Sequence, residues 1–260
     1  MKVVVGLGNI GIAMAQRLVA QGREVIGVDL SPERRAEWQE LTGLEAVTSL
    51  HEVPWAEVAH VLVVVRLTDQ AESVLKTLDS VPLPEGAGVL VSTTLDLDYA
   101  RGLGRYDDRP WRLIEMPVSG GAGGARAGTL TLMLAGNHDD READMFADLG
   151  AVSVKLDEFG QPTLAKLLNN VSAAYTAVSY AEMMVLAEQA GMRPQLLREV
   201  LRTSSGGSWM GEAFLNPSID LLSKDVDLFR SQIGTLPVVD LNGAVDILDR
   251  LRAGRTALGQ

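Results

Sequence analysis

The sequence predicts an α/β protein in which a parallel-sheet domain, residues 1–160, precedes an all-α domain, residues 161–260. Two observations predict this class. Short apolar runs alternate with amphipathic segments as far as Gly160, and alternating β and α units form a parallel sheet with helices on both faces. Beyond that glycine, apolar residues recur at helical spacing and no convincing strand pattern follows. The boundary is expected within "DEFGQP", residues 157–162.

The expected elements follow in order along the chain. Strands are predicted for the apolar runs at 2–6, 24–29, 59–65, 88–93, 112–119, 129–136 and 151–156. Helices are predicted at 9–22, 31–43, 69–78, 96–103 and 139–150, and then at 161–190, 194–203, 217–232 and 237–255. Ser31 and Pro32 suit the start of a helix, and Gly22 and Gly191 suit helix ends.

Composition excludes several classes of function. A net charge of -11 over 260 residues provides neither the basic patch that nucleic acids need nor a polybasic segment for anionic membranes. There is no cysteine for disulfides or thiolate ligands, and the three histidines lack metal-ligand spacing, so no metal site is expected. No signal peptide is evident and no apolar run reaches the ~18 residues of a membrane span, so a cytoplasmic protein is expected.

A glycine turn joins the first predicted strand to the first predicted helix. Its G-x-G-x-x-G spacing has the strand–turn–helix context that a dinucleotide site requires, which predicts a Rossmann-type domain. The first glycine allows the tight turn, the second lets the backbone approach a pyrophosphate, and the third lets the helix pack on the strand. The helix N-terminus then holds the phosphates. The predicted cofactor-binding residues are Gly6, Leu7, Gly8, Asn9, Ile10 and Gly11. A simple glycine turn is the less favoured alternative.

Asp29 ends the second predicted strand, at the position that contacts the adenosine ribose in a dinucleotide site. A carboxylate there accepts hydrogen bonds from both ribose hydroxyls and repels a 2′-phosphate. We therefore expect NAD as the cofactor. Arg34 and Arg35 follow closely and could hold the extra phosphate, so NADP remains the less favoured alternative.

A second glycine-rich segment, "MPVSGGAGGARAGTL", lies between two predicted strands. Its side chains are small apart from Arg126, so its backbone amides can surround a small anion such as a carboxylate. A flexible loop is the alternative interpretation.

The predicted helix 161–190 carries a polar group on an otherwise apolar sequence. Lys166, Asn169 and Asn170 stand at i, i+3 and i+4, so they share a face. The apolar residues of the other stripe are Leu164, Leu167, Leu168, Val171 and Tyr175. A solvated face is the usual explanation of a lysine. However, asparagine is a poor helix former, and the helix becomes apolar all round after this trio, which indicates burial. The trio is therefore predicted to line a cleft.

Together these motifs resemble the β-hydroxyacid dehydrogenases, a family that includes 3-hydroxyisobutyrate dehydrogenase and tartronate semialdehyde reductase and is related to 6-phosphogluconate dehydrogenase and imine reductases. "GLGNIGIAMAQRL" is similar to the family's cofactor signature, "VSTTLD" to its Ser-Thr segment and "PVSGGAGGARAGTLTLMLAG" to its substrate-binding segment. "GQPTLAKLLNN" resembles its catalytic helix, and "LLSKDVDLF" its Lys-Asp-Leu motif. The resemblance extends over nearly the whole chain.

The resemblance implies a role for each matching residue. Lys166 would be the catalytic residue, protonating a carbonyl oxygen as hydride arrives and taking the hydroxyl proton in the reverse direction. A lysine suits this task because burial can lower its pKa. The resemblance implies substrate binding by Ser119, Gly120, Gly121 and Asn170, and cofactor binding by Thr93 and Lys224, the latter beside Asp225 in its motif.

The chain departs from the family pattern at several places. Arg66-Leu67 replaces the usual Leu-Pro, Glu115-Met116 replaces the usual Asp-Ala, and the segment between Ser205 and Lys224 is shorter than usual. Asn169 stands where sugar-phosphate relatives carry histidine, which weighs against a 6-phosphogluconate substrate. Lys166 weighs against imine reduction, because an Asp or Tyr commonly replaces it there.

The expected function is NAD-dependent interconversion of a small β-hydroxyacid and its semialdehyde or keto form by hydride transfer. An imine-reducing enzyme and a catalytically silent nucleotide-binding relative, suggested by the shortened segment, are the alternatives. A homodimer or higher homo-oligomer is also expected. About four helices are too few to cover a helix as apolar as 161–190 within one chain, and the family's helical domains pair.

Overall fold

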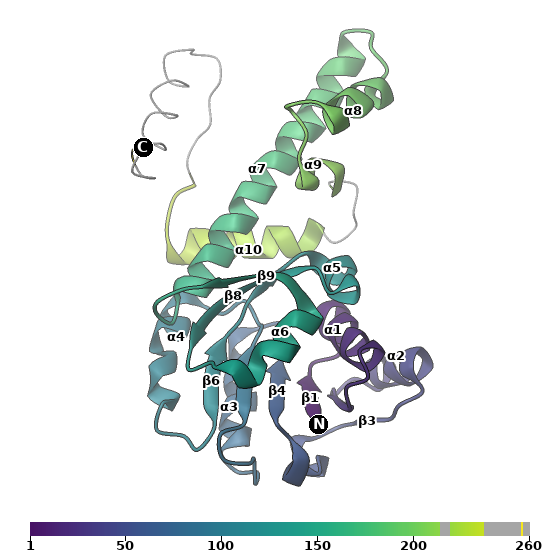
Figure 1. Ribbon diagram of the computed structural model, residues 1–260. Coiled ribbons are helices and arrows are strands. Elements are labelled where there is room, and N and C mark those ends of the chain that lie inside the picture. Colours follow the sequence, from purple (N-terminus) through teal and green to yellow (C-terminus); the bar gives the residue numbers. More distant parts are fainter. Residues whose placement is uncertain (214–218, 237–255, 257–260) are drawn as a thin grey trace.

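The computed structural model describes residues 1–213, 219–236 and 256. A mostly parallel sheet with helices on both faces forms the N-terminal part, and helices alone follow it in the described C-terminal part, which confirms the predicted fold class (Figure 1). The strands are β1 (Lys2–Val5), β2 (Val25–Val28), β3 (Ala46–Val47), β4 (His60–Val63), β5 (Gly88–Val91), β6 (Arg112–Glu115), β7 (Val118–Ser119), β8 (Leu130–Gly136) and β9 (Gly150–Lys155).

Most predicted helices occur near their expected bounds. The helices are α1 (Asn9–Ala20), α2 (Pro32–Thr42), α3 (Thr68–Leu78), α4 (Leu97–Arg101), α5 (Gly121–Ala127), α6 (Ala143–Leu149), α7 (Gln161–Gln189), α8 (Pro194–Thr203), α9 (Trp209–Ala213) and α10 (Ile219–Gln232). The sequence did not predict α5 or α9. The helix predicted at 96–103 ends early and continues as a 3₁₀ turn, Gly102–Tyr106, because glycine is a poor helix former. The helix predicted at 237–255 lies outside the described residues.

The sheet order is β3-β2-β1-β4-β5-β6-β8-β7, with β9 also paired to β8. All pairings from β3 to β6 are parallel, so the carboxyl ends of these strands meet at one edge. Within this parallel-dominant sheet, β8 is an exception that the sequence did not predict, because it runs antiparallel to β6 and β7. After β6 the chain stays at the carboxyl edge through β7 and α5, so β8 enters the sheet from that edge.

Two apolar layers hold the sheet between its helices. One layer contains Met14 and Leu18 of α1 and Trp38 of α2, all 0% exposed. The other contains Leu75 of α3 and Leu103, also 0% exposed. These layers fix the carboxyl edge of the sheet, where the site described below is built.

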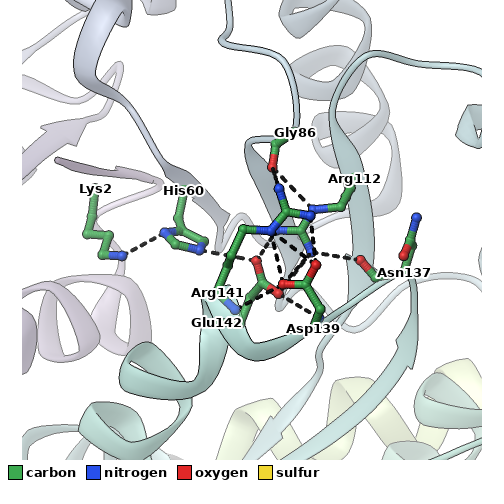
Figure 2. A network of polar contacts seen from close by, with 8 residues as sticks. All are labelled: Lys2, His60, Gly86, Arg112, Asn137, Asp139, Arg141 and Glu142. Carbon is green, nitrogen blue, oxygen red and sulfur yellow. Dashed lines mark hydrogen bonds and ion pairs between the residues drawn. The ribbon is translucent and has the colours of Figure 1, made fainter.

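A buried polar network lies near the amino ends of β1, β4 and β6 (Figure 2). Glu142, 0% exposed, accepts from Arg112 through both carboxylate oxygens and from His60 Nε2 at 3.2 Å. Lys2 Nζ lies 2.6 Å from His60 Nδ1, and the Asp139 amide donates to Glu142 Oε2 at 2.9 Å. Its groups are paired with one another, and it lies at the edge of the sheet opposite the glycine turn.

The helical part is organised around α7, which starts on the sheet domain and extends away from it (Figure 1). Its base packs against α10 through Leu167, Val171 and Phe229, while α8 and α9 lie along its distal half. The residues that α7 buries follow one stripe and not all sides. Within the described part of one chain, α7 is therefore not buried all round, as the small number of helices led us to expect: Val178 is 61% exposed.

Among the described residues, we find no helix that is both long enough and apolar enough to cross a membrane.

Candidate active site

The three glycines of the turn between β1 and α1 have different surroundings. Gly6 has φ +96°, and a Cβ there would lie 2.5 Å from the Val64 carbonyl oxygen. A Cβ at Gly11 would overlap the Gly6 carbonyl oxygen. Gly8 differs from both, since no atom lies within 4 Å of its missing Cβ. Two glycines are thus required by internal packing, whereas Gly8 borders open space, which is what the approach of a pyrophosphate to the backbone requires.

The turn leads directly into a helix terminus suited to phosphate. Gly8 is the residue before α1, and the following amides of Asn9, Ile10 and Gly11 have no partner within the helix. There is no acidic side chain in the first turn of α1 to repel an anion. Free amides and the positive end of a helix dipole are the features by which dinucleotide sites bind phosphate, so these residues could hold one. Leu7, by contrast, is buried and can contribute only its backbone.

Asp29 lies beside the turn and connects it to the start of α2. Its Oδ2 accepts the Leu7 amide at 2.7 Å and its Oδ1 accepts the Ser31 amide at 2.8 Å. Arg35 donates to the Asp29 carbonyl oxygen at 2.7 Å, and Arg34 pairs with Glu37 at 2.7 Å. The carboxylate therefore stands next to the phosphate-binding turn, with two cations close behind it.

Thr93, two residues after β5, is buried, and its hydroxyl is hydrogen-bonded to the main chain. The hydroxyl donates to the Val65 carbonyl oxygen at 3.0 Å and accepts from the Val65 amide at 3.1 Å. Thr93 thus holds the segment that follows β4 against β5. Any contribution to a nicotinamide site would come from the loop that it positions.

Lys166 is half-buried near the base of α7. Burial lowers the pKa of its ammonium below the ordinary value, while the Asp225 carboxylate opposes this shift and Lys224 adds to it. A lysine with a lowered pKa can exchange a proton at a pH closer to neutrality.

Asn170 and Asp225 form a buried hydrogen-bonded pair near this lysine. Asn170 is 9% exposed and its Nδ2 donates to Asp225 Oδ2 at 2.5 Å. The other oxygen, Asp225 Oδ1, pairs with Lys224 Nζ at 3.2 Å. The sequence placed Asp225 in a motif near the cofactor but did not connect it to Asn170. The 55 residues between them give no local signal of the contact.

The glycine-rich segment meets α7 at Asn169. Asn169 Nδ2 donates to Ser119 Oγ at 3.3 Å and to Asn170 Oδ1 at 3.1 Å. After Ser119 the chain turns through Gly120 and Gly121, whose φ values of +131° and +64° favour glycine. The segment is therefore neither a flexible loop nor an extended one, because Gly121 begins α5.

The predicted polar face of α7 divides into three environments. Asn170 is buried, Lys166 is half-buried, and Asn169 is exposed toward Ser119. Leu168, expected in the apolar stripe, is 49% exposed. The structure brings the catalytic and substrate-binding candidates together, along with Lys224, whereas Asp29 belongs to the separate glycine turn.

Two other features of the described residues lie apart from this site. A groove of about 960 Å³ beside the first turn of α7 is lined by residues outside the predicted site, including Arg101, Trp111 and Phe159. Among the described residues, no group of three or more His, Asp or Glu side chains is arranged to hold a metal ion.

Comparison with known proteins agrees with this geometry. Residues 3–156 match the NAD binding domain of 6-phosphogluconate dehydrogenase. Residues 160–244 match a domain described as NAD-binding of NADP-dependent 3-hydroxyisobutyrate dehydrogenase. The chain belongs to the β-hydroxyacid dehydrogenase family. The resemblance inferred from the motifs is thereby confirmed.

Individual members of the family are similar over most of the chain. L-threonate dehydrogenase of Cupriavidus necator is 30% identical over 246 residues, which cover 89% of this chain and 80% of that protein. Mitochondrial 3-hydroxyisobutyrate dehydrogenase of Homo sapiens is 30% identical over 224 residues, or 82% of this chain, but the match spans only 64% of that enzyme. The crystal structure of a 3-hydroxyisobutyrate dehydrogenase from Salmonella typhimurium shares the fold, with a TM-score of 0.77, 23% identity and coverage of 98% and 94% of the two chains.

Proposed function

We propose that this protein is an NAD-dependent oxidoreductase that interconverts a small β-hydroxyacid and its semialdehyde or keto form. The observation that carries the proposal is the contact between α7 and the glycine-rich segment, made by Asn169 and Ser119 at 3.3 Å. The contact joins the helix that carries Lys166, a lysine with a lowered pKa, to the segment whose amides precede and begin α5. The relatives named as 3-hydroxyisobutyrate and L-threonate dehydrogenases support the same reaction class.

The chemistry assigns one task to each part of the site. Ser119, Gly120 and Gly121 would hold the substrate carboxylate through their amides and the serine hydroxyl. Asn170 would hydrogen-bond the substrate oxygen without competing for its proton, since an amide does not titrate. Lys166 would take the hydroxyl proton during oxidation and return it during reduction. Bound at the glycine turn, the nicotinamide cofactor would supply the hydride acceptor or donor.

NAD is proposed over NADP because the Asp29 carboxylate stands next to the turn. A ribose hydroxyl can donate to it, whereas a 2′-phosphate would face a like charge. Arg34 is already paired with Glu37, which weakens its availability for phosphate. Arg35 donates to the carbonyl oxygens of Asp29 and Leu30 and has no carboxylate partner among the described contacts, so it is the residue that would bind the 2′-phosphate of NADP.

We also propose that two copies associate through the distal half of α7 and through α8. The exposed apolar residues there are Val178, Met183, Val185, Leu186, Leu196 and Val200, between 40% and 61% exposed. A patch of this kind on a soluble protein marks an interaction site. The domain boundary is proposed at Gly160, which has φ +88° and directly precedes α7. The cytoplasmic location stays a prediction from composition.

A substrate panel tests the proposal. Small β-hydroxyacids, their semialdehydes and cyclic imines are each offered with NAD(H) and NADP(H), and nicotinamide absorbance is followed. Turnover of a hydroxyacid pair with NAD is the expected result. Preferential reduction of imines would move the protein to the imine-reducing class. Cofactor binding without turnover of any compound would support a silent relative instead.

A further inference from the structure

The amino end of α7 is capped by a side chain from the sheet. Glu115, the last residue of β6, is 0% exposed. Its Oε2 accepts the Gly160 amide at 2.6 Å and its Oε1 accepts the Thr163 amide at 2.8 Å. The helix has no side-chain cap from Gly160, the residue before it. A strand 45 to 48 residues earlier in the chain therefore supplies the cap.

This cap accounts for the remaining main-chain donors at the start of α7. The Gln161 amide donates to the Glu158 carbonyl oxygen at 3.2 Å, and Pro162 has no N–H. The two bonds to Glu115 engage the amides of Gly160 and Thr163. A carboxylate suits this place twice, because both oxygens accept and its charge complements the positive end of the helix. A glutamine would turn an NH₂ group toward one of the two amides.

Glu115 binds the first turn of α7, directly before the site residues of that helix. Thr163, Lys166 and Asn170 are spaced i, i+3 and i+7, so they follow one stripe of the helix. Four residues after Glu115, the Ser119 hydroxyl contacts Asn169. The segment from β6 to β7 thus touches α7 both before and after Lys166.

Burial and hydrogen bonding act in opposite directions on the ionisation of Glu115. Burial raises the pKa of Glu115 above its ordinary value, against the opposing hydrogen bonds from Thr163 and Gly160. The fold therefore disfavours the charged form that both amides require. Glu142 shows the opposite balance in an equally buried carboxylate. Burial alone would raise its pKa, but hydrogen bonds from His60, Arg112 and the Asp139 amide bring it to about 2.

We propose that Glu115 is a positioning residue, which fixes Lys166 relative to the substrate-binding segment Ser119–Gly121 by anchoring the first turn of α7. The inference rests on the proposed function, because positioning has a kinetic meaning only if Lys166 moves a proton. The anchoring itself is independent of any substrate.

The test compares Glu115→Gln with Glu115→Asp and with Glu142→Gln as the matched control. Glu115→Gln should lower kcat by about 10- to 100-fold, the order expected when a reacting group shifts by up to about 1 Å. The Kd for NAD should stay within about twofold, because the phosphate site belongs to the glycine turn. Glu115→Asp keeps the charge on a shorter arm and should retain more activity than Glu115→Gln. Glu142→Gln should lower the thermal midpoint and leave kcat within about twofold.

Hydrogen exchange provides the readout that needs no substrate. In Glu115→Gln the amides of Gly160 and Thr163 should exchange at least about tenfold faster, because one loses its acceptor. In Glu142→Gln their exchange should not change. Unaltered exchange in Glu115→Gln would overturn the anchoring. Faster exchange with unaltered kcat would overturn the positioning, and so would equal kcat losses in both glutamine variants or a Glu115→Asp protein less active than Glu115→Gln. If no compound is turned over by the wild type, the exchange result still decides the anchoring while the proposed function fails.

Discussion

Replacing Lys166 by methionine tests the proton-transfer role most directly. Methionine keeps an unbranched stem of similar length in the half-buried position but cannot carry a proton. A general acid–base residue typically contributes about 10²–10⁴-fold, or roughly 2.7–5.4 kcal/mol of activation free energy at 1.36 kcal/mol per decade. We expect kcat in both directions to fall by that factor, while the Kd for NAD changes little.

The lowered pKa of Lys166 adds two pH signatures to this substitution. In the wild type, kcat/KM for oxidation should rise with pH through an inflection below the ordinary lysine value of 10.5, because the neutral amine is the base. The same shift means that the unfolded chain binds more protons than the fold between the lowered pKa and 10.5. The wild type therefore gains stability as pH rises through that window, and Lys166→Met should lose this slope.

The assay follows nicotinamide absorbance across pH with the best substrate of the panel, and urea unfolding across the same range. Lys155→Met is the matched control, since Lys155 is an exposed lysine on β9. Lys166→Arg should not restore turnover, because a guanidinium stays protonated. Near-normal turnover by Lys166→Met would refute the catalytic assignment, and so would an equal loss in the Lys155 control.

Three further predictions address the neighbouring groups. Asp225→Asn should move the kcat/KM inflection of Lys166 to still lower pH, because the carboxylate raises that pKa; an unmoved or raised inflection would contradict the electrostatic link. Steady-state kcat/KM should favour NAD over NADP by at least about tenfold, roughly 1.4 kcal/mol. Asp29→Ser should reduce that ratio, and a wild type that prefers NADP would point to Arg35 instead. Gly8→Ala should fold with an unchanged thermal midpoint but bind NAD at least about tenfold more weakly, since its Cβ would occupy open space; unchanged titration calorimetry would contradict this.

The parts of the fold that the sequence could predict are those with local signals. The glycine turn, the alternation of strands and helices, and the long helix all have such periodicity or spacing, and the structure has them. The contacts that complete the site do not. Asn170 and Asp225 are hydrogen-bonded although 55 residues separate them in the sequence. Glu115 accepts hydrogen bonds from amides at the start of α7 that lie 45 to 48 residues later. Only tertiary packing brings residues so far apart in the sequence into contact.

The sequence did not predict α5 or the direction of β8, and the two have different physical reasons. The three glycines within residues 121–127 disfavour a helix by propensity, yet α5 forms because it packs against α1 in the tertiary structure. The direction of β8 depends on the edge of the sheet at which the preceding segment ends. The apolar pattern of a strand carries no information on its direction.

Because α7 is one continuous helix anchored at its amino end, a tilt of the helix moves its distal end far more than it moves Lys166. At about 1.5 Å per residue, the 29 residues of α7 extend over roughly 43 Å, whereas Lys166 lies only about 8 Å from the anchored end. A rigid tilt that moved the distal tip by about 3 Å would shift Lys166 by only about 0.5 Å. The outer end can therefore adapt to whatever packs against it while the proton-carrying amine keeps its place.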